Sequence, residues 1–125
     1  MFEVRYFITS FLSLTLWLLG GFDLLAKSLV ALMAIDYATG VAAGYKQQKL
    51  NSNKAYKGIG KKILILTLLC SASIMDRVLP SVGIRTLVAI FYCVTEMLSI
   101  TENVAKLGLP IPTKLKKALE QLRKK

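Results

Sequence analysis

The chain contains no histidine and only two cysteines among its 125 residues. Both cysteines, Cys70 and Cys93, lie within long apolar runs, so the sequence predicts neither a Cys/His metal site nor a disulfide framework. Without histidine the usual general base is missing, and no nucleophile paired with a base or phosphate-binding loop is recognisable. These absences argue against an enzyme and against a metal ion or another cofactor.

Acidic residues are also scarce: seven Asp and Glu stand against seventeen Lys and Arg, which gives a net charge of +10. In a soluble protein this excess would raise the question of nucleic acid. However, 54% of the residues are hydrophobic and the mean hydropathy is +0.54, which is too apolar for a soluble domain of this size. We therefore expect an all-α integral membrane protein, and the basic residues fit membrane orientation and anionic lipid better than nucleic acid.

Four apolar runs predict about four transmembrane helices in two hairpins. The runs cover residues 6–22, 24–44, 63–75 and 82–100. The first two runs would together form a helix of roughly 58 Å, about twice the ~30 Å hydrocarbon core, so the chain must turn between them. Gly20-Gly21-Phe22-Asp23 supplies the residues for that turn, and Pro80-Ser81-Val82-Gly83 supplies those for the second hairpin.

The third run is the shortest, since residues 63–75 number only thirteen. We expect it to span the membrane only if Lys61 and Lys62 extend toward the membrane surface and if the helix continues through Leu79. Three spans are the alternative, in which residues 6–22 lie in the membrane interface.

Residues 45–62 form a lysine-rich connector without acidic residues, which we interpret as a solvated loop. This connector and the basic C-terminus are separated by two spans, so the positive-inside rule places both in the cytoplasm. The N-terminus is then cytoplasmic only if residues 6–22 cross the membrane. The predicted organisation is a transmembrane domain at residues 1–107 and a tail at residues 108–125.

Prolines separate this tail from the last span. Pro110 and Pro112 stop any helix, and Thr113 can cap a new one. Apolar residues then recur at helical spacing, which predicts a short amphipathic basic helix facing anionic lipid headgroups; a merely solvated tail is the alternative. Its basic residues are Lys114, Lys116, Lys117, Arg123, Lys124 and Lys125.

One carboxylate and two glycines form a stripe on the second span, because Asp36, Gly40 and Gly44 are each four residues apart. An ionised side chain near mid-membrane costs about 2.5–3.5 kcal/mol on insertion scales, so it usually faces other protein. Asp36 could relay protons or hold helices together. The Gly40/Gly44 pair favours helix packing and assembly, since it lets another backbone approach closely.

A second polar stripe lies near the end of the last span, where Glu96, Ser99 and Asn103 fall on one helix face. Glu96 and Ser99 are candidates for helix packing and assembly, although Glu96 could equally lie at a wet membrane interface. For Glu102 and Asn103 we favour the wet cytoplasmic interface.

Several segments, in this order and spacing, resemble the bacteriophage holin family that includes the clostridial toxin-secretion holins. The segments are residues 35–40, 50–52, 57–63, 96–103 and 106–112, and the resemblance covers roughly residues 25–122. The residues that carry it are Asp36, Tyr37, Gly40, Ser52, Gly58, Lys61, Lys62, Glu96, Ser99, Glu102, Asn103, Gly108, Pro110 and Pro112.

The resemblance implies a multi-pass protein that accumulates in the cytoplasmic membrane of a bacterial host. There it would associate with further copies of itself and form lesions through which an endolysin or a toxin leaves the cell, which times host-cell lysis. Two other classes stay open on the residues alone. One is a small proton-coupled multidrug exporter with Asp36 or Glu96 as its proton site, and the other is a non-conducting membrane adaptor.

Overall fold

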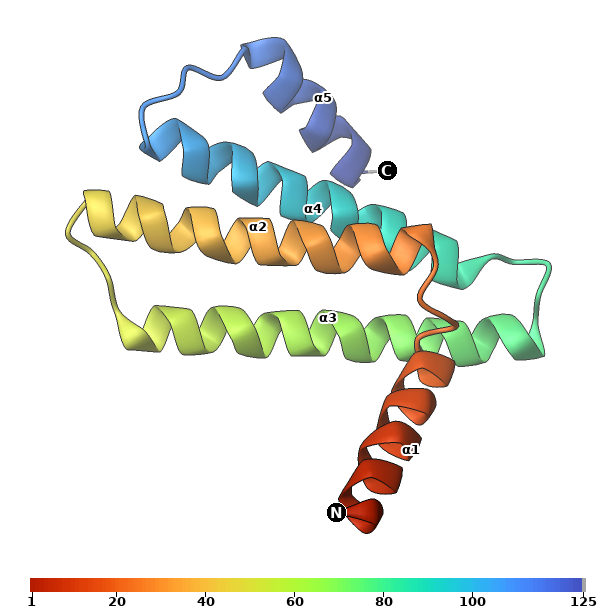
Figure 1. The fold of residues 1–125 in the computed structure, drawn as a ribbon. Coiled ribbons are helices and arrows are strands. Elements are labelled where there is room, and N and C mark those ends of the chain that lie inside the picture. Colours follow the sequence, from red (N-terminus) through yellow and green to blue (C-terminus); the bar gives the residue numbers. More distant parts are fainter. Residues whose placement is uncertain (125) are drawn as a thin grey trace.

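The structure, a computed structural model, describes residues 1–124 and is all-helical over that range (Figure 1). Its helices are α1 (Phe2–Leu18), α2 (Leu24–Lys46), α3 (Ser52–Val78), α4 (Ile84–Lys106) and α5 (Thr113–Lys124). Helices α2, α3 and α4 are long and apolar enough to cross a membrane. The two predicted turns, at residues 20–23 and 80–83, are confirmed as the links before α2 and before α4.

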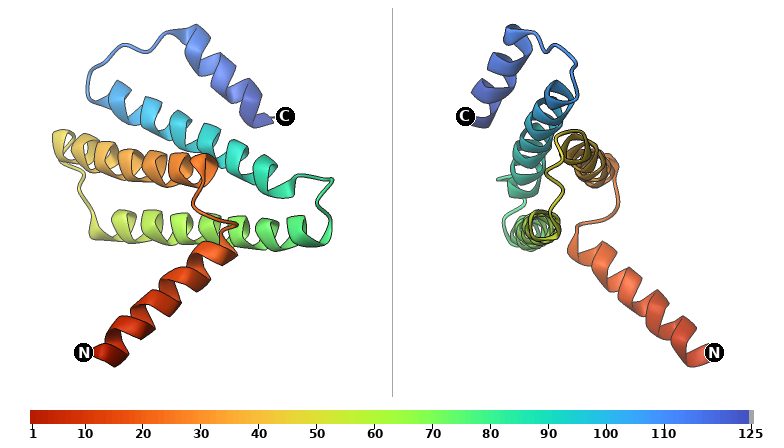
Figure 2. Two further views of the ribbon diagram at one scale, coloured as in Figure 1. Left: turned by 45° about the vertical axis from the view of Figure 1, so that its right-hand side comes forward. Right: turned by 90° about the vertical axis from the view of Figure 1, so that its left-hand side faces the viewer.

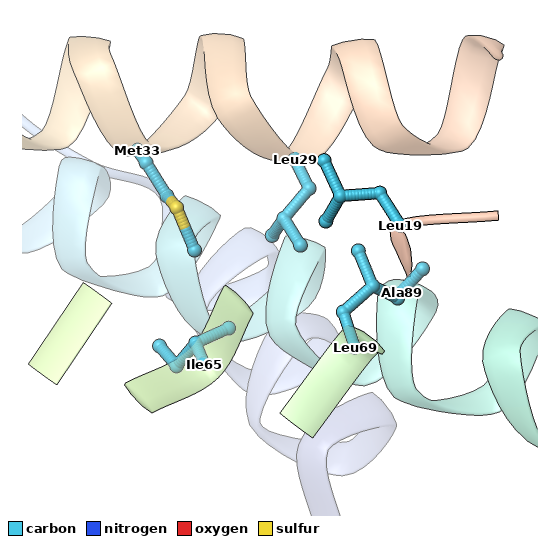
Figure 3. Close-up of a cluster of buried hydrophobic side chains, with 6 residues drawn as sticks. All are labelled: Leu19, Leu29, Met33, Ile65, Leu69 and Ala89. Atoms are coloured by element: carbon cyan, nitrogen blue, oxygen red, sulfur yellow. The ribbon is translucent and has the colours of Figure 1, made fainter. Parts of the chain in front are cut away.

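Helices α2, α3 and α4 form a bundle in which both α2 and α3 pack mainly against α4 (Figure 2). The buried core is small and lies between these helices (Figure 3). It consists of Leu29 and Met33 from α2, Ile65 and Leu69 from α3, Ala89 from α4, and Leu19 from the α1–α2 link. Most other apolar side chains point outward, as expected for helices whose outer faces contact lipid.

Local capping explains where the bundle helices begin. Asp23 caps α2 by accepting a hydrogen bond from the backbone N–H of Ala26 at 3.1 Å. Asn51 caps α3 in the same way, accepting from the N–H of Asn53 at 2.8 Å. Gly83 precedes α4 with a φ of 70°, a left-handed conformation that glycine adopts without strain.

Helix α3 corrects the prediction of a solvated loop over residues 45–62. The loop is limited to residues 47–51, because α3 begins at Ser52 and runs for 27 residues. The first part of α3 could not be recognised as a helix from the sequence, because lysines together with Gly58 and Gly60 interrupt any apolar period. At about 40 Å, α3 is long enough to cross a membrane without the stretching that the thirteen-residue apolar run required.

Helix α1 does not form the predicted first hairpin. It projects away from the bundle, contains no buried residue, and reaches α3 through its C-terminal end rather than packing along α2 (Figures 1 and 2). Its 17 residues extend for about 26 Å, close to the lower limit for a span. A fourth span therefore stays a prediction.

Helix α5 begins directly after Pro112 and folds back beside α4 (Figure 1). It buries no residue completely. The exposed side chains include Lys114, Lys116, Lys117, Arg123 and Lys124, whereas Lys125 lies outside the described residues. Their predicted contact with lipid headgroups stays a prediction.

Candidate functional site

Three ionisable side chains meet in the middle of the bundle, one from each helix. The Lys62 ammonium donates to Asp36 Oδ2 at 2.8 Å and to Glu96 Oε2 at 3.0 Å. The side chains of Lys62, Asp36 and Glu96 are 18%, 13% and 5% exposed, respectively. We call these three residues the ion triad. It links α2, α3 and α4 at a single point.

The triad lies at one depth in the bundle. Asp36 lies ten residues before the end of α2, Lys62 ten residues after the start of α3, and Glu96 ten residues before the end of α4. Ten residues of helix extend about 15 Å, which is half of a ~30 Å hydrocarbon core. With these helix ends at the membrane surface, the triad would lie near mid-membrane, where an unpaired charge is costly.

Asn103 provides further hydrogen bonds to Asp36. Its side-chain amide donates to Asp36 Oδ1 at 2.9 Å, to the Asp36 carbonyl at 3.1 Å and to Thr39 Oγ1 at 3.0 Å. Asn103 is buried, so its predicted place at a wet interface is wrong; Glu102, one residue earlier, is exposed. Both carboxylate oxygens of Asp36 thus have a partner within the chain.

Lys62 is the main residue whose role the sequence reading missed. It was expected to extend to the membrane surface with Lys61, but it turns inward while Lys61 is exposed. Lys62 lies as far from the start of α3 as Asp36 and Glu96 lie from the ends of α2 and α4, but this relation can be recognised only when the start of α3 is known. Two carboxylates share one ammonium, so removal of Lys62 would leave two buried like charges without compensation.

The stripe of Asp36, Gly40 and Gly44 faces residues of the same chain. A Cβ at Gly40 would lie 3.5 Å from the Asn103 amide nitrogen, and a Cβ at Gly44 would lie 3.3 Å from Leu50. The close helix approach expected at Gly40 therefore occurs between α2 and α4 within the chain. A contact between copies at this face stays a prediction.

A cleft of about 280 Å³ opens beside the triad, between α2, the loop at residues 47–51, α3 and α4. It contains several of the residues singled out from the sequence: Asp36, Tyr37, Gly40, Gly44, Gly58, Lys62, Ser99 and Asn103. The others lie elsewhere. Ser52 starts α3, and Gly108, Pro110 and Pro112 form the exposed link between α4 and α5.

A second polar cluster holds the opposite end of the bundle. Arg85, at the start of α4, is buried and donates to the Leu19 carbonyl at 2.7 Å and to both carboxylate oxygens of Asp23 at 2.9 and 3.0 Å. These hydrogen bonds from Arg85 are the main cause that lowers the pKa of Asp23 to about 2. Asp76, in turn, accepts from the backbone N–H groups of Ile84 and Arg85.

This cluster, which we call the Arg85 clamp, fixes the α1–α2 link. Gly20 has a φ of +82°, and a Cβ there would lie only 2.5 Å from both Arg85 Nε and Ser73 Oγ. The Arg77 guanidinium stacks on the Trp17 ring at 3.9 Å and donates to the Trp17 carbonyl. The end of α1 is thus held firmly, although the rest of the helix is not. Among residues 1–124 no group of three or more metal-ligating side chains gathers.

The sequence matches a family of known proteins over most of its length. The family model described as the bacteriophage holin family matches residues 13–124. The chain is 44% identical to an uncharacterised 14.9 kDa protein of Clostridium perfringens, over 98% of this chain and 94% of the relative. It is 37% identical to the uncharacterised YqxH of Bacillus subtilis, over 85% and 76% of the two chains.

A phage protein is also among the relatives. The chain is 35% identical to the probable holin of Bacillus phage phi105, over 67% of this chain and 63% of the relative. No solved structure matches the chain.

Proposed function

Because this chain belongs to the bacteriophage holin family, we propose that it accumulates in the cytoplasmic membrane of its bacterial host and assembles into lesions that time host-cell lysis. The lesions release an endolysin or a toxin from the cytoplasm. The observation that carries the proposal is the family match over residues 13–124, which includes all three helices able to cross a membrane.

Release of a folded enzyme requires many copies. A cargo domain of about 200 residues has a radius of gyration near 16 Å and a diameter of roughly 40 Å, while packed helices lie about 8–10 Å apart. A ring around such a cargo needs on the order of sixteen helices facing the hole. The 280 Å³ cleft of one chain is far too small, so the lesion is an assembly.

The distribution of lysines supports a common cytoplasmic side for the basic segments. The loop at residues 47–51, the start of α3 and the link from α4 to α5 lie at the same end of the bundle (Figure 1). This end carries Lys46, Lys49, Lys54, Lys57 and Lys106. By the positive-inside rule we place it in the cytoplasm.

Helix α1 is the part of the chain whose relation to the membrane is least constrained by the bundle. Its exposed side chains include Phe7, Phe11 and Leu14, and only its C-terminal end is held by the Arg85 clamp. We propose that α1 enters the membrane, as a fourth span or along the interface, and offers apolar surface to other copies.

The ion triad favours a holin over a proton-coupled exporter. In an exporter, Asp36 or Glu96 would bind and release protons, whereas both carboxylates here share Lys62 and Asp36 is also held by Asn103. These contacts suit a residue that stabilises helix packing. A non-conducting adaptor would use the basic loop and tail to recruit a partner.

Expression of this chain alone in bacteria separates the three classes. A holin depolarises the membrane and stops growth after a delay. An exporter confers resistance to particular compounds without killing the cell, and Asp36→Asn abolishes that resistance at every expression level. An adaptor leaves the membrane intact.

A further inference from the structure

The cleft beside the ion triad reaches from the basic end of the bundle to mid-membrane depth. Asp36 and Lys62 line its inner end, while Lys49, Lys54 and Lys106 line its outer part. Because the triad lies about 15 Å from the helix ends, the cleft runs through roughly one leaflet of the bilayer. Its outer part therefore lies where lipid phosphates are found.

The outer part of the cleft carries uncompensated positive charge. Lys49, Lys54 and Lys106 form no ion pair with any residue in the described range 1–124, whereas Lys62 is neutralised by the two carboxylates of the triad. These lysines come from three places, the α2–α3 loop, the first turn of α3 and the last residue of α4, so the bundle itself brings them together. Three lysines that line one cleft without a paired carboxylate attract an anion.

The start of α3 reinforces this preference. Asn51 and Ala55 both line the cleft, and the first turn of α3 contains no acidic residue. The start of a helix carries partial positive charge, and although the neutral Asn51 side chain caps the Asn53 N–H, no carboxylate of the first turn offsets that charge.

The rest of the cleft lining is mixed. Val41, Ala43 and Leu50 contribute apolar atoms, whereas Gln47, Ser99 and Asn103 contribute polar ones. With a volume of about 280 Å³, the cleft is large enough for a phosphate with a glycerol unit. A ligand that fits both parts has an anionic head and an apolar continuation.

We propose that this cleft binds the phosphate headgroup of an anionic membrane phospholipid. The phosphate lies among Lys49, Lys54 and Lys106, and the glycerol and the start of an acyl chain extend further into the cleft, past the apolar residues of its lining. The site differs from the basic tail at residues 113–124, which would contact lipid only as an exposed surface. Binding of this lipid does not depend on lesion formation, so the two proposals can fail separately.

The test uses the purified full chain in neutral detergent. Dioleoylphosphatidylglycerol, dioleoylphosphatidylcholine or inorganic phosphate is added, and native mass spectrometry counts bound lipid while circular dichroism records the Tm. We expect phosphatidylglycerol to be retained and to raise the Tm, with little effect of phosphatidylcholine or inorganic phosphate. Equal retention of the two lipids overturns the proposal, and full displacement by inorganic phosphate overturns the assignment to lipid.

Two pairs of variants locate the bound lipid. Lys49→Gln/Lys54→Gln/Lys106→Gln removes three charges from the cleft and should weaken phosphatidylglycerol binding roughly tenfold or more. Lys114→Gln/Lys116→Gln/Lys117→Gln removes three charges from α5 and should leave it nearly unchanged. An equal loss in both variants would show general surface attraction and contradict a site in the cleft.

The second pair fills the cleft without changing charge. A Cβ at Gly58 or at Gly60 meets no atom within 4 Å, so both sites tolerate a side chain, but only Gly58 lines the cleft. Gly58→Leu should reduce lipid retention while Gly60→Leu should not, and both variants should keep the helical fold. Unchanged retention in Gly58→Leu would show that lipid binds elsewhere.

Discussion

The Lys62 ammonium lies 2.8 Å from Oδ2 of Asp36, and this ion pair joins two helices, α3 and α2, that otherwise touch each other little. Both helices pack mainly against α4, which supplies Glu96 as the second partner of Lys62. The ion pair therefore adds a charged contact to the small apolar core in which side chains of α2 and α3 meet. In a membrane, where apolar association between helices is weak, such a contact specifies the arrangement.

Replacement of Lys62 should destabilise the bundle. Lys62→Met leaves two carboxylates close together without a cation, and loss of one partner of a buried pair costs on the order of 3 kcal/mol. We expect a lower Tm in detergent by circular dichroism. Lys61→Met is the matched control, because Lys61 is exposed and its replacement should change stability by less than about 0.5 kcal/mol.

Further substitutions in the Lys62→Met variant test whether uncompensated charge causes its loss of stability. Addition of Asp36→Asn and Glu96→Gln to Lys62→Met removes the uncompensated charges and should restore most of the lost stability. A triple variant that is no more stable than Lys62→Met would contradict the role given to the triad.

Two neighbouring glycines should respond differently to the same substitution. Gly20 and Gly21 both have positive φ angles, +82° and +95°, so alanine is strained at either position. Only at Gly20 would the new Cβ also collide with Arg85 and Ser73. Gly20→Ala should therefore lower the Tm clearly more than Gly21→Ala, and equal effects would show that the Arg85 clamp does not constrain this link.

The Arg85 clamp should also lose strength in acid. The folded protein holds the pKa of Asp23 at about 2, below its ordinary value of 3.8. Because the folded pKa is the lower one, the stabilisation is complete above pH 3.8 and is lost as the pH falls toward 2. The Tm difference between the natural protein and Asp23→Asn should be largest near neutral pH and should shrink over this range. A difference that is constant with pH would contradict the ion pair.

Gly40→Leu should delay or abolish lysis while the protein still inserts into the membrane. A Cβ at Gly40 is in ordinary contact with Asn103 at 3.5 Å, so alanine fits but the longer leucine side chain must push α4 away from α2. Gly40→Ala is the control and should keep the timing of lysis. The measurement is the time from induction to loss of turbidity, at equal amounts of protein in the membrane. Unchanged timing in Gly40→Leu would contradict a role in lysis for the α2 face that carries Asp36, Gly40 and Gly44.

Much of the fold could be predicted from apolar run length and turn residues alone. The helical class, the turns at residues 20–23 and 80–83, and the membrane-competent helices α2 and α4 follow from these local features. The start of α3 does not, because its first turns are rich in lysine and glycine and lack an apolar period. Their helical state depends on the Asn51 cap and on packing of the helix further along.

Only some residues of the candidate site could be predicted from the sequence. Asp36 and Glu96 were recognisable because a carboxylate inside an apolar run is unusual. The inward orientation of Lys62 and Asn103 could not be predicted, since each is next to another polar residue, Lys61 or Glu102, and only the tertiary arrangement shows which of the two is buried. The role of Arg85 could not be predicted either, because its hydrogen-bond partners lie more than sixty residues earlier in the chain.

The most direct test of lesion formation is to induce this chain together with a cytoplasmic endolysin and to follow membrane potential and extracellular endolysin activity over time. The proposed function predicts an initial period of normal growth, then abrupt depolarisation with simultaneous release of the enzyme. Stronger induction should shorten that period, because assembly requires a critical density in the membrane. An intact potential with continued growth, at confirmed membrane insertion, would contradict the holin function.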